Sequence, residues 1–169
     1  MQWISPVCTR CSLSATRRRV VQPAVPLGAK VLFLGRDPGE VEDRTGTPFD
    51  PSAPAGRLLR GMIQEYRIPP EWCGFDNVIH CHTPKNRGPK DEEVAACASW
   101  GRLVRARLPK SVEIIVTLGQ EALEALLRPE GYRKGKPLQI LGDVRGQVQQ
   151  FQGWKLLPMY HPSAALRSG

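Results

Sequence analysis

The sequence predicts an α/β fold with a central, mostly parallel, four-stranded sheet. Four short apolar segments have the composition of buried strands, and the three intervening segments carry apolar residues at helical spacing. Strands that alternate with helices form a parallel sheet that is covered on both faces. The chain of 169 residues has the size of a single domain. We therefore expect one domain over residues 1–169, with residues 1–28 as an amino-terminal arm.

The predicted strands are short and bounded by turn-forming residues. They are KVLFL (30–34), NVIHC (77–81), VEIIVTLG (112–119) and WKLLPMY (154–160). Gly35 follows the first, a turn-rich TPKNRGPK segment follows the second, and Pro162 comes soon after the fourth. Short apolar runs with such boundaries favour strands over helices.

The predicted helices occupy residues 55–67, 91–108 and 120–127. Leu59 and Ile63 share one stripe of the first helix, and the pair Pro69-Pro70 ends it. The second helix has an apolar stripe that includes Cys97, and Pro109 ends it.

Polar motifs follow each predicted strand. GRDPGEVED follows the first, HCHTPKNR overlaps and follows the second, TLGQ closes the third, and HPS follows the fourth. Ligands of parallel α/β sheets bind outside the carboxyl ends of the strands. The sequence therefore predicts a functional site at this edge of the sheet.

The charge balance indicates a polyanionic partner. Lys and Arg outnumber Asp and Glu by 24 to 16, which gives a formal net charge of +8. Such a balance is typical of proteins that bind nucleic acid. No apolar run approaches the roughly 18 residues that cross a bilayer, and no secretory signal is evident. We expect a cytoplasmic protein with no membrane partner.

The five cysteines indicate metal ligands or reactive thiols rather than disulfides, since no secretory signal is evident. Cys8 and Cys11 form a CxxC pair. Cys81 and Cys97 can complete four thiolates only if the arm folds back over the second strand and the next helix. Four such ligands suit zinc or an iron–sulfur cluster. Alternatively, Cys97 is a small core residue and Cys81 a buried strand residue. Cys73 lies outside the set of four.

The motifs, taken in order, resemble one family. Cys8-x-x-Cys11, GRDPGEVED, TGTPF, NVIHCHTPKNR, a helical Cys, VTLG, VRG and YHPSAALR are similar to those of the iron–sulfur uracil-DNA glycosylases of the fourth family. The resemblance implies a three-layer α/β/α sandwich and a monomeric DNA repair enzyme. Its activity would be to flip uracil out of DNA and hydrolyse the N-glycosidic bond, leaving an abasic site. It also implies a structural [4Fe–4S] cluster on Cys8, Cys11, Cys81 and Cys97.

The sequence departs from the fourth-family motif at Arg36 and Asp37, where that family has Glu followed by a small residue. The sequence G-x-D-P at this position is instead similar to the first motif of the best-known uracil-DNA glycosylases, in which the Asp positions the attacking water. HPS is similar to their second motif. We therefore expect Asp37 to orient water against an oxocarbenium-like sugar and His161 to donate a hydrogen bond to uracil O2.

The resemblance assigns further residues to base and DNA binding. Phe49 would stack on the flipped base, Asn77 would pair with the uracil edge, and Gly35 lies in the base-binding motif. Leu166 would be a wedge in the gap left by the flipped nucleotide. The remaining candidate DNA contacts are Lys85, Arg87, Arg145, Ser163 and Arg167.

Plainer alternatives remain open. Asp37 can cap a turn, Phe49 can be a core aromatic, and Asn77 and His161 can be ordinary strand-edge and loop residues. Arg36 would repel a cationic sugar and so favours a glycosylase-like DNA-binding protein without catalysis. A glycosylase of shifted base specificity and a zinc-binding nucleic-acid module are further alternatives.

Overall fold

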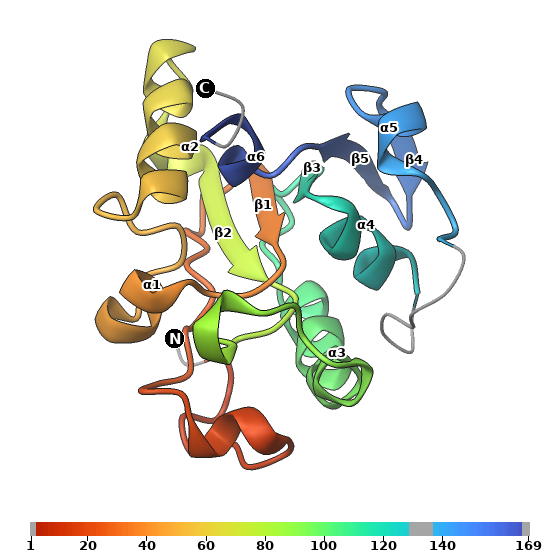
Figure 1. Ribbon diagram of the computed structural model, residues 1–169. Coiled ribbons are helices and arrows are strands. Elements are labelled where there is room, and N and C mark those ends of the chain that lie inside the picture. Colours follow the sequence, from red (N-terminus) through yellow and green to blue (C-terminus); the bar gives the residue numbers. More distant parts are fainter. Residues whose placement is uncertain (1–2, 129–136, 167–169) are drawn as a thin grey trace.

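Five strands, rather than the predicted four, form the central sheet. The computed structural model describes residues 3–128 and 137–166. The strand order is β2-β1-β3-β5-β4 (Figure 1). The neighbouring strands among β2, β1, β3 and β5 pair in parallel, whereas β4 is antiparallel to β5. The α/β class and the mostly parallel sheet are confirmed, and the strand count was wrong.

The additional strand is β4 (Gln149–Phe151), a three-residue edge strand. It forms a hairpin with β5 (Trp154–Met159) through Gln152 and Gly153, whose φ angles are 47° and 90°. A short polar edge strand carries no apolar run, and for this reason the hydrophobic pattern missed it.

The second strand lies earlier in the chain than predicted. β2 spans Cys73–Asn77, so Asn77 ends the strand instead of beginning it. β2 lies beside β1 (Val31–Gly35), and the next neighbour is β3 (Ile114–Leu118). Val78 and Ile79 belong to the loop after β2, where their N–H groups donate to the carbonyl oxygens of Gly35 and Arg36, both at 2.9 Å.

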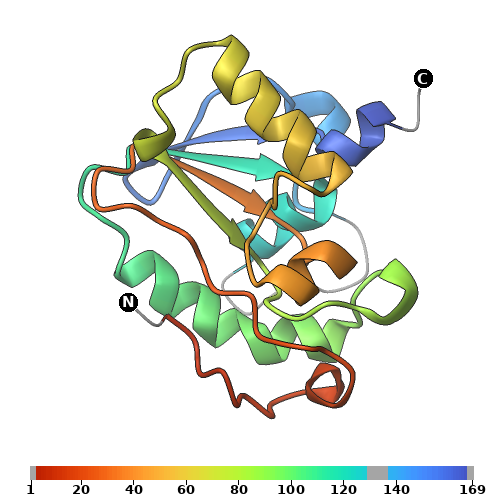
Figure 2. The same ribbon diagram turned by 90° about the vertical axis from the view of Figure 1, so that its left-hand side faces the viewer.

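Helices cover both faces of the sheet. On one face, α2 (Pro54–Glu65) packs through Leu59 and Ile63 against Phe33 and Phe75. On the other face, α4 (Gln120–Leu127) packs against Leu32 and Ile115. The long α3 (Asp91–Ala106) lies below the sheet in Figure 2, opposite α2. The short helices are α1 (Glu40–Thr45), α5 (Leu141–Val144) and α6 (Pro162–Leu166).

The amino-terminal arm runs beside α3 and the loop after β2 (Figure 2). The backbone N–H groups of Trp3 and Ile4 donate to the Gln22 side chain, which closes the arm into a loop. Trp3, Ile4 and Leu13 then share a hydrophobic cluster with α3. The arm therefore folds back as the four-cysteine hypothesis requires.

Three short 3₁₀ turns complete the described chain: Ser12–Ala15 in the arm, Pro70–Trp72 before β2 and Pro84–Asn86 after it. Within residues 3–128 and 137–166, no helix is both long enough and apolar enough to cross a bilayer.

Candidate functional site

Three predicted base-binding residues meet where β1 and β2 end. Gly35 and Asn77 are paired across the two strands. A Cβ atom on Gly35 would lie 2.4 Å from Oδ1 of Asn77 and 2.7 Å from Cζ of Phe49. The amide and the aromatic ring therefore both approach the Gly35 backbone, and only glycine leaves room for this approach. The structure thus brings these three predicted residues together at one edge of the sheet.

The loop that carries Phe49 is held by two residues that the sequence analysis did not single out. The Phe49 backbone has a φ of 49°, which is unfavourable for an aromatic residue. Its N–H donates to Glu42 Oε1 at 2.6 Å, and its carbonyl oxygen accepts from Arg60 Nε at 2.7 Å. The backbone of this loop also packs against Gly56, where a Cβ would lie 2.1 Å from the Asp50 carbonyl oxygen.

Glu42 is one of the three acids that close the GRDPGEVED motif. Its second carboxylate oxygen accepts the N–H of Gly39, which precedes α1. Burial raises the pKa of Glu42, although the hydrogen bonds from Gly39 and Phe49 oppose this shift. The adjacent Asp43 accepts N–H groups of Arg18 and Arg19 from the arm. These acids are therefore part of the scaffold that positions Phe49 and the arm.

His161 lies at the same edge of the sheet, between β5 and α6. Its ring centroid is 6.2 Å from that of Phe49, with an interplanar angle of 35°. Nδ1 accepts the backbone N–H of Ser163 at 3.2 Å and lies 2.8 Å from the Ser163 hydroxyl oxygen. The bond from the Ser163 N–H favours the tautomer in which Nδ1 is the acceptor and Nε2 carries the hydrogen.

Asp37 is nearly buried, with 6% of its side chain exposed, and both its carboxylate oxygens are bonded. Oδ1 accepts from Arg36 Nε, and Oδ2 accepts from the Thr83 hydroxyl at 2.8 Å. Arg36 also lies 3.6 Å from the Glu121 carboxylate. The ring of His82 bonds the Pro38 carbonyl oxygen at 3.0 Å. Side chains of the loop after β2 thus fix the loop after β1.

The candidate DNA contacts differ in how much of each side chain is available. Lys85, in the 3₁₀ turn Pro84–Asn86, and Arg145, after α5, are exposed. Arg145 lies over the Tyr160 ring at 4.8 Å. Leu166 is 50% exposed in α6. Arg167 lies outside the described residues.

Arg87 is held by a buried acid. Its two terminal nitrogens lie 2.9 and 2.6 Å from the two carboxylate oxygens of Glu93, which is fully buried in α3. The hydrogen bonds from Arg87, working against burial, lower the pKa of Glu93 to about 2. The guanidinium therefore anchors the loop after β2 to α3.

The four predicted ligand cysteines gather around one hydrophobic cluster between the arm, α3 and the loop after β2. Cys81 and Cys97 are buried in it, and Cys8 and Cys11 pack against it. Cys97 lies close enough to Cys11 and Cys81 for its charge to raise the pKa of both thiols. Burial raises the pKa of Cys81 to about 12. Within residues 3–128 and 137–166, no group of three or more His, Cys, Asp or Glu side chains converges on a single-ion site.

Cys73 is in a different part of the molecule. It begins β2, belongs to the cluster on the α2 face of the sheet, and its thiol donates to the Pro69 carbonyl oxygen at 3.7 Å. Cys73 therefore lies apart from the four predicted ligands, which belong to another cluster.

His80 and Asp76 form a buried polar network that the sequence analysis missed. Asp76 Oδ1 lies 2.9 Å from His80 Nε2 and accepts the Asn77 backbone N–H at 2.7 Å. Burial lowers the pKa of His80, but the charge and hydrogen bond of Asp76 outweigh it and raise the pKa to about 9. Burial likewise raises the pKa of Cys97, but His80 outweighs it and lowers that pKa.

Comparison with known proteins places the chain in a family. A family model described as the uracil DNA glycosylase superfamily matches residues 22–169. The type-4 uracil-DNA glycosylase of Thermotoga maritima is 37% identical over 163 residues, which is 95% of this chain and 79% of that protein. The type-4 enzyme of Saccharolobus solfataricus is 33% identical over 94% of this chain and 72% of its own length.

A type-5 enzyme matches a shorter region. The type-5 uracil-DNA glycosylase of Thermus thermophilus is 36% identical over 119 residues, or 63% of this chain. The type-4 enzymes cover the cysteine-bearing arm as well, because their matches extend over nearly the whole chain. The chain therefore belongs to the uracil-DNA glycosylase superfamily and, within it, to the type-4 uracil-DNA glycosylases.

Proposed function

We propose that this protein is a DNA repair glycosylase that removes uracil from DNA by hydrolysing its N-glycosidic bond. The observation that supports this most directly is the assembly of Gly35, Phe49 and Asn77 beside His161 at the carboxyl ends of the strands. Ligand sites of parallel α/β sheets lie at this edge. With α2 on one face of the sheet and α3 and α4 on the other, we infer the three-layer α/β/α sandwich of this superfamily.

Base selection would depend on Phe49 and Asn77. The Phe49 ring offers a stacking surface for a base that has left the helix, a contact worth about 1–3 kcal/mol. The Asn77 amide both donates and accepts, so it can donate to uracil O4 and accept from N3–H. Cytosine presents the opposite pattern, with an amino donor in place of O4 and an acceptor at N3. The amide orientation therefore discriminates uracil from cytosine.

His161 would stabilise the leaving group. When the glycosidic bond breaks, uracil departs with negative charge that needs a hydrogen-bond donor near O2. In the tautomer that this role requires, Nδ1 of His161 accepts from Ser163 and Nε2 carries the hydrogen to be donated. Ser163 thus positions the catalytic imidazole, which gives this predicted DNA contact a second role.

Asp37 would stabilise the oxocarbenium-like sugar and orient the attacking water. Arg36 donates to one oxygen of this carboxylate and Thr83 to the other, and the two bonds fix the orientation of the group. Arg36 also has Glu121 as a neighbour. A guanidinium that is hydrogen-bonded to one carboxylate and lies near a second disturbs the sugar cation less than an unpaired one would.

The four cysteines Cys8, Cys11, Cys81 and Cys97 would hold a structural [4Fe–4S] cluster. Their thiols gather from the arm, the loop after β2 and α3. A cubane cluster takes each thiolate on a separate iron, so the sulfurs need not converge on one point as they must for a single zinc ion. The buried Nδ1 of His80 has no hydrogen-bond partner among the described residues and lies on the side of Cys97, where sulfur ligands would accept from it. When bound, the cluster supplies cross-links between the arm and the sheet.

DNA would lie over the exposed cations at the strand ends. Lys85 and Arg145 are exposed candidates for phosphate contacts, and Leu166 is an exposed candidate wedge. Arg87 would position the loop that carries Lys85, because its guanidinium is already bonded to Glu93.

A second candidate function is DNA binding without catalysis. The direct bond between Arg36 and Asp37 favours it, because the pair places a cation beside the carboxylate that the reaction needs. Uracil release from an oligonucleotide by protein purified without oxygen distinguishes the two. A glycosylase releases uracil, and release collapses in Asp37→Asn and His161→Ala. A binding protein retains DNA affinity and releases no base from any modified substrate.

A further inference from the structure

A continuous chain of buried side chains connects one of the four gathered cysteines with the base-binding amide. It begins at Cys97 in α3, passes through His80 and Asp76, and ends at the backbone of Asn77. His80, Asp76 and Asn77 are 1%, 3% and 4% exposed. Solvent does not separate these buried side chains. Displacement of one of them therefore shifts the next.

The Cys97 end of this chain is formed by His80. Both the ring and the backbone N–H of His80 face the Cys97 thiol. Nδ1 is buried, and apart from the Cys97 thiol that the ring faces it has no hydrogen-bond partner among the described residues, so a stronger acceptor on that side would stabilise the ring. His80 also immediately precedes Cys81 in the sequence. Two of the four cysteines therefore bear directly on the position of this ring.

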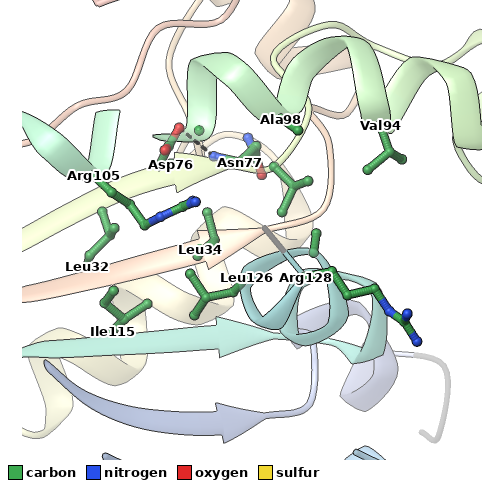
Figure 3. A pocket seen from close by; sticks show the side chains of 13 residues that line it. Leu32, Leu34, Asp76, Asn77, Val94, Ala98, Arg105, Ile115, Leu126 and Arg128 are labelled. Atoms are coloured by element: carbon green, nitrogen blue, oxygen red, sulfur yellow. Dashed lines mark hydrogen bonds between the residues drawn. The ribbon is translucent and has the colours of Figure 1, made fainter. Parts of the chain in front are cut away.

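The Asn77 end is formed by Asp76. A single carboxylate oxygen, Oδ1, accepts from the Asn77 backbone N–H and bonds the His80 ring. Figure 3 shows the bond from Asp76 to Asn77 at the rim of a small cavity of about 30 Å³, with Arg105 extending into it from α3. That volume has room for about one water molecule. The carboxylate is thus held by its hydrogen bonds rather than by dense packing on that side.

We infer that His80 and Asp76 are positioning residues that couple occupancy of the four-cysteine site to recognition of uracil by Asn77. This inference rests on the proposed function at both ends. A group bound to Cys81 and Cys97 fixes the His80 ring, the ring fixes the Asp76 carboxylate, and the carboxylate fixes the peptide that carries the Asn77 side chain. Coupling between two sites is reciprocal. Uracil bound at Asn77 therefore strengthens binding of the group held by the cysteines, and we expect the tighter binding to slow its loss.

The test measures cluster loss rather than catalysis. The holoprotein is exposed to an iron chelator, and its visible absorbance is followed with and without a saturating single-stranded oligonucleotide that contains 2′-fluoro-2′-deoxyuridine. The fluorine disfavours the cationic sugar, so the strand binds without being cleaved. A matched strand carries the corresponding cytidine. We expect the uracil strand to slow cluster loss at least about fivefold, the lower end of typical couplings, and the cytosine strand to slow it much less.

Two variants interrupt the chain, and one is a matched control. His80→Phe keeps a ring and removes both nitrogens, and Asp76→Asn keeps the shape and removes the charge. The control, Thr117→Val, replaces a fully buried hydroxyl on β3 that has no hydrogen-bond partner among the described residues. We expect the uracil effect to disappear in His80→Phe, to weaken in Asp76→Asn and to persist in Thr117→Val. A residue with only a structural role would change cluster loss equally with and without the strand.

The outcomes separate this inference from the proposed function. If the uracil effect is unchanged in both variants, or if the unsubstituted protein binds cluster and uracil strand without mutual effect, the coupling is overturned alone. If the unsubstituted protein carries no cluster or does not prefer uracil, the proposed function and the coupling are overturned together. If His80→Phe cannot hold a cluster, the test rests on Asp76→Asn. A weaker uracil effect in that variant supports the coupling, and an unchanged effect overturns it.

Discussion

The carboxylate of Glu42 accepts a hydrogen bond from the backbone N–H of Phe49 at 2.6 Å. This bond joins α1 to the loop that presents the candidate stacking ring, and it offsets part of the cost of a positive φ at Phe49. Because Glu42 is buried and bonds Gly39 with its other oxygen, it holds two loops of the site at once.

Glu42→Gln should weaken uracil release while leaving the protein folded. The amide can accept from only one of the two N–H groups, and its own N–H₂ opposes the other. Loss of one bond to a charged acceptor is worth about 1.5 kcal/mol, which corresponds to about a tenfold lower rate of uracil release. Single-turnover cleavage of a uracil oligonucleotide measures this effect. Glu40→Gln, in the exposed first turn of the same helix, should cleave at the normal rate.

Gly35→Ala should abolish most of the activity. The added methyl group would lie 2.4 Å from Asn77 Oδ1 and 2.7 Å from the Phe49 ring, so one of them must move. Displacements of about 1 Å in a reacting site cost about a hundredfold in rate.

The matched control is Gly61→Ala in α2, where nothing lies within 4 Å of the new methyl group. This exposed helical site should gain stability, by up to about 1 kcal/mol, with normal uracil release. Equal loss of activity in the two alanine variants would contradict the tight approach at Gly35.

The Glu93 carboxylate should make stability depend on pH in the acid range. Its pKa is lowered to about 2 in the folded protein by Arg87, Lys90 and Ser12. A carboxylate whose folded pKa lies below its unfolded value stabilises the fold above the unfolded pKa, near 4.5. This contribution should be lost as the pH falls from about 4.5 toward 2.

Urea unfolding of Glu93→Gln checks this expectation. Removing the charge that accepts hydrogen bonds from Arg87, whose side chain is 34% exposed, should cost about 2 kcal/mol of unfolding free energy at neutral pH. This difference from the unsubstituted protein should narrow below pH 4.5. Glu92→Gln replaces a neighbouring carboxylate that is 71% exposed and 3.9 Å from Lys90, and should have little effect. A difference that stays constant down to pH 2 would refute the role of the charge.

Cysteine substitutions should separate ligands from the remaining thiol. Cys97→Ser should remove the visible absorbance of protein purified without oxygen, because Cys97 is buried where the four thiols gather. Cys73→Ser should keep it, because Cys73 lies on the opposite face of the sheet. A colourless protein that contains one zinc ion would overturn the cluster assignment.

The sequence predicted the fold class and three of the strands because these depend on apolar runs. It misplaced β2 because CGFDN contains Gly, Asp and Asn, whereas the more apolar Val78 and Ile79 enter the core from a loop. It missed β4 because Gln149 and Gln150 form an edge.

The sequence motifs predicted Phe49, Asn77 and His161 as site residues. They did not predict the residues whose hydrogen bonds hold the backbone of this site in place. Glu42 and Arg60 act through backbone atoms of Phe49, and Asp76 acts through the Asn77 N–H. Such bonds depend on tertiary distance and leave no spacing pattern. The capping position of Glu42, three residues after Gly39, is the one signal that pointed to such a role.

Base release by Asn77→Asp under single-turnover conditions, with uracil and cytosine strands, measures whether Asn77 reads the base. A carboxylate accepts from the cytosine amino group and cannot donate to uracil O4. We predict that uracil release falls at least about a hundredfold, since a site built for such a hydrogen bond strongly rejects a mismatched partner, and that cytosine release becomes measurable. Unchanged uracil release would contradict the assignment of Asn77 as the residue that reads the base.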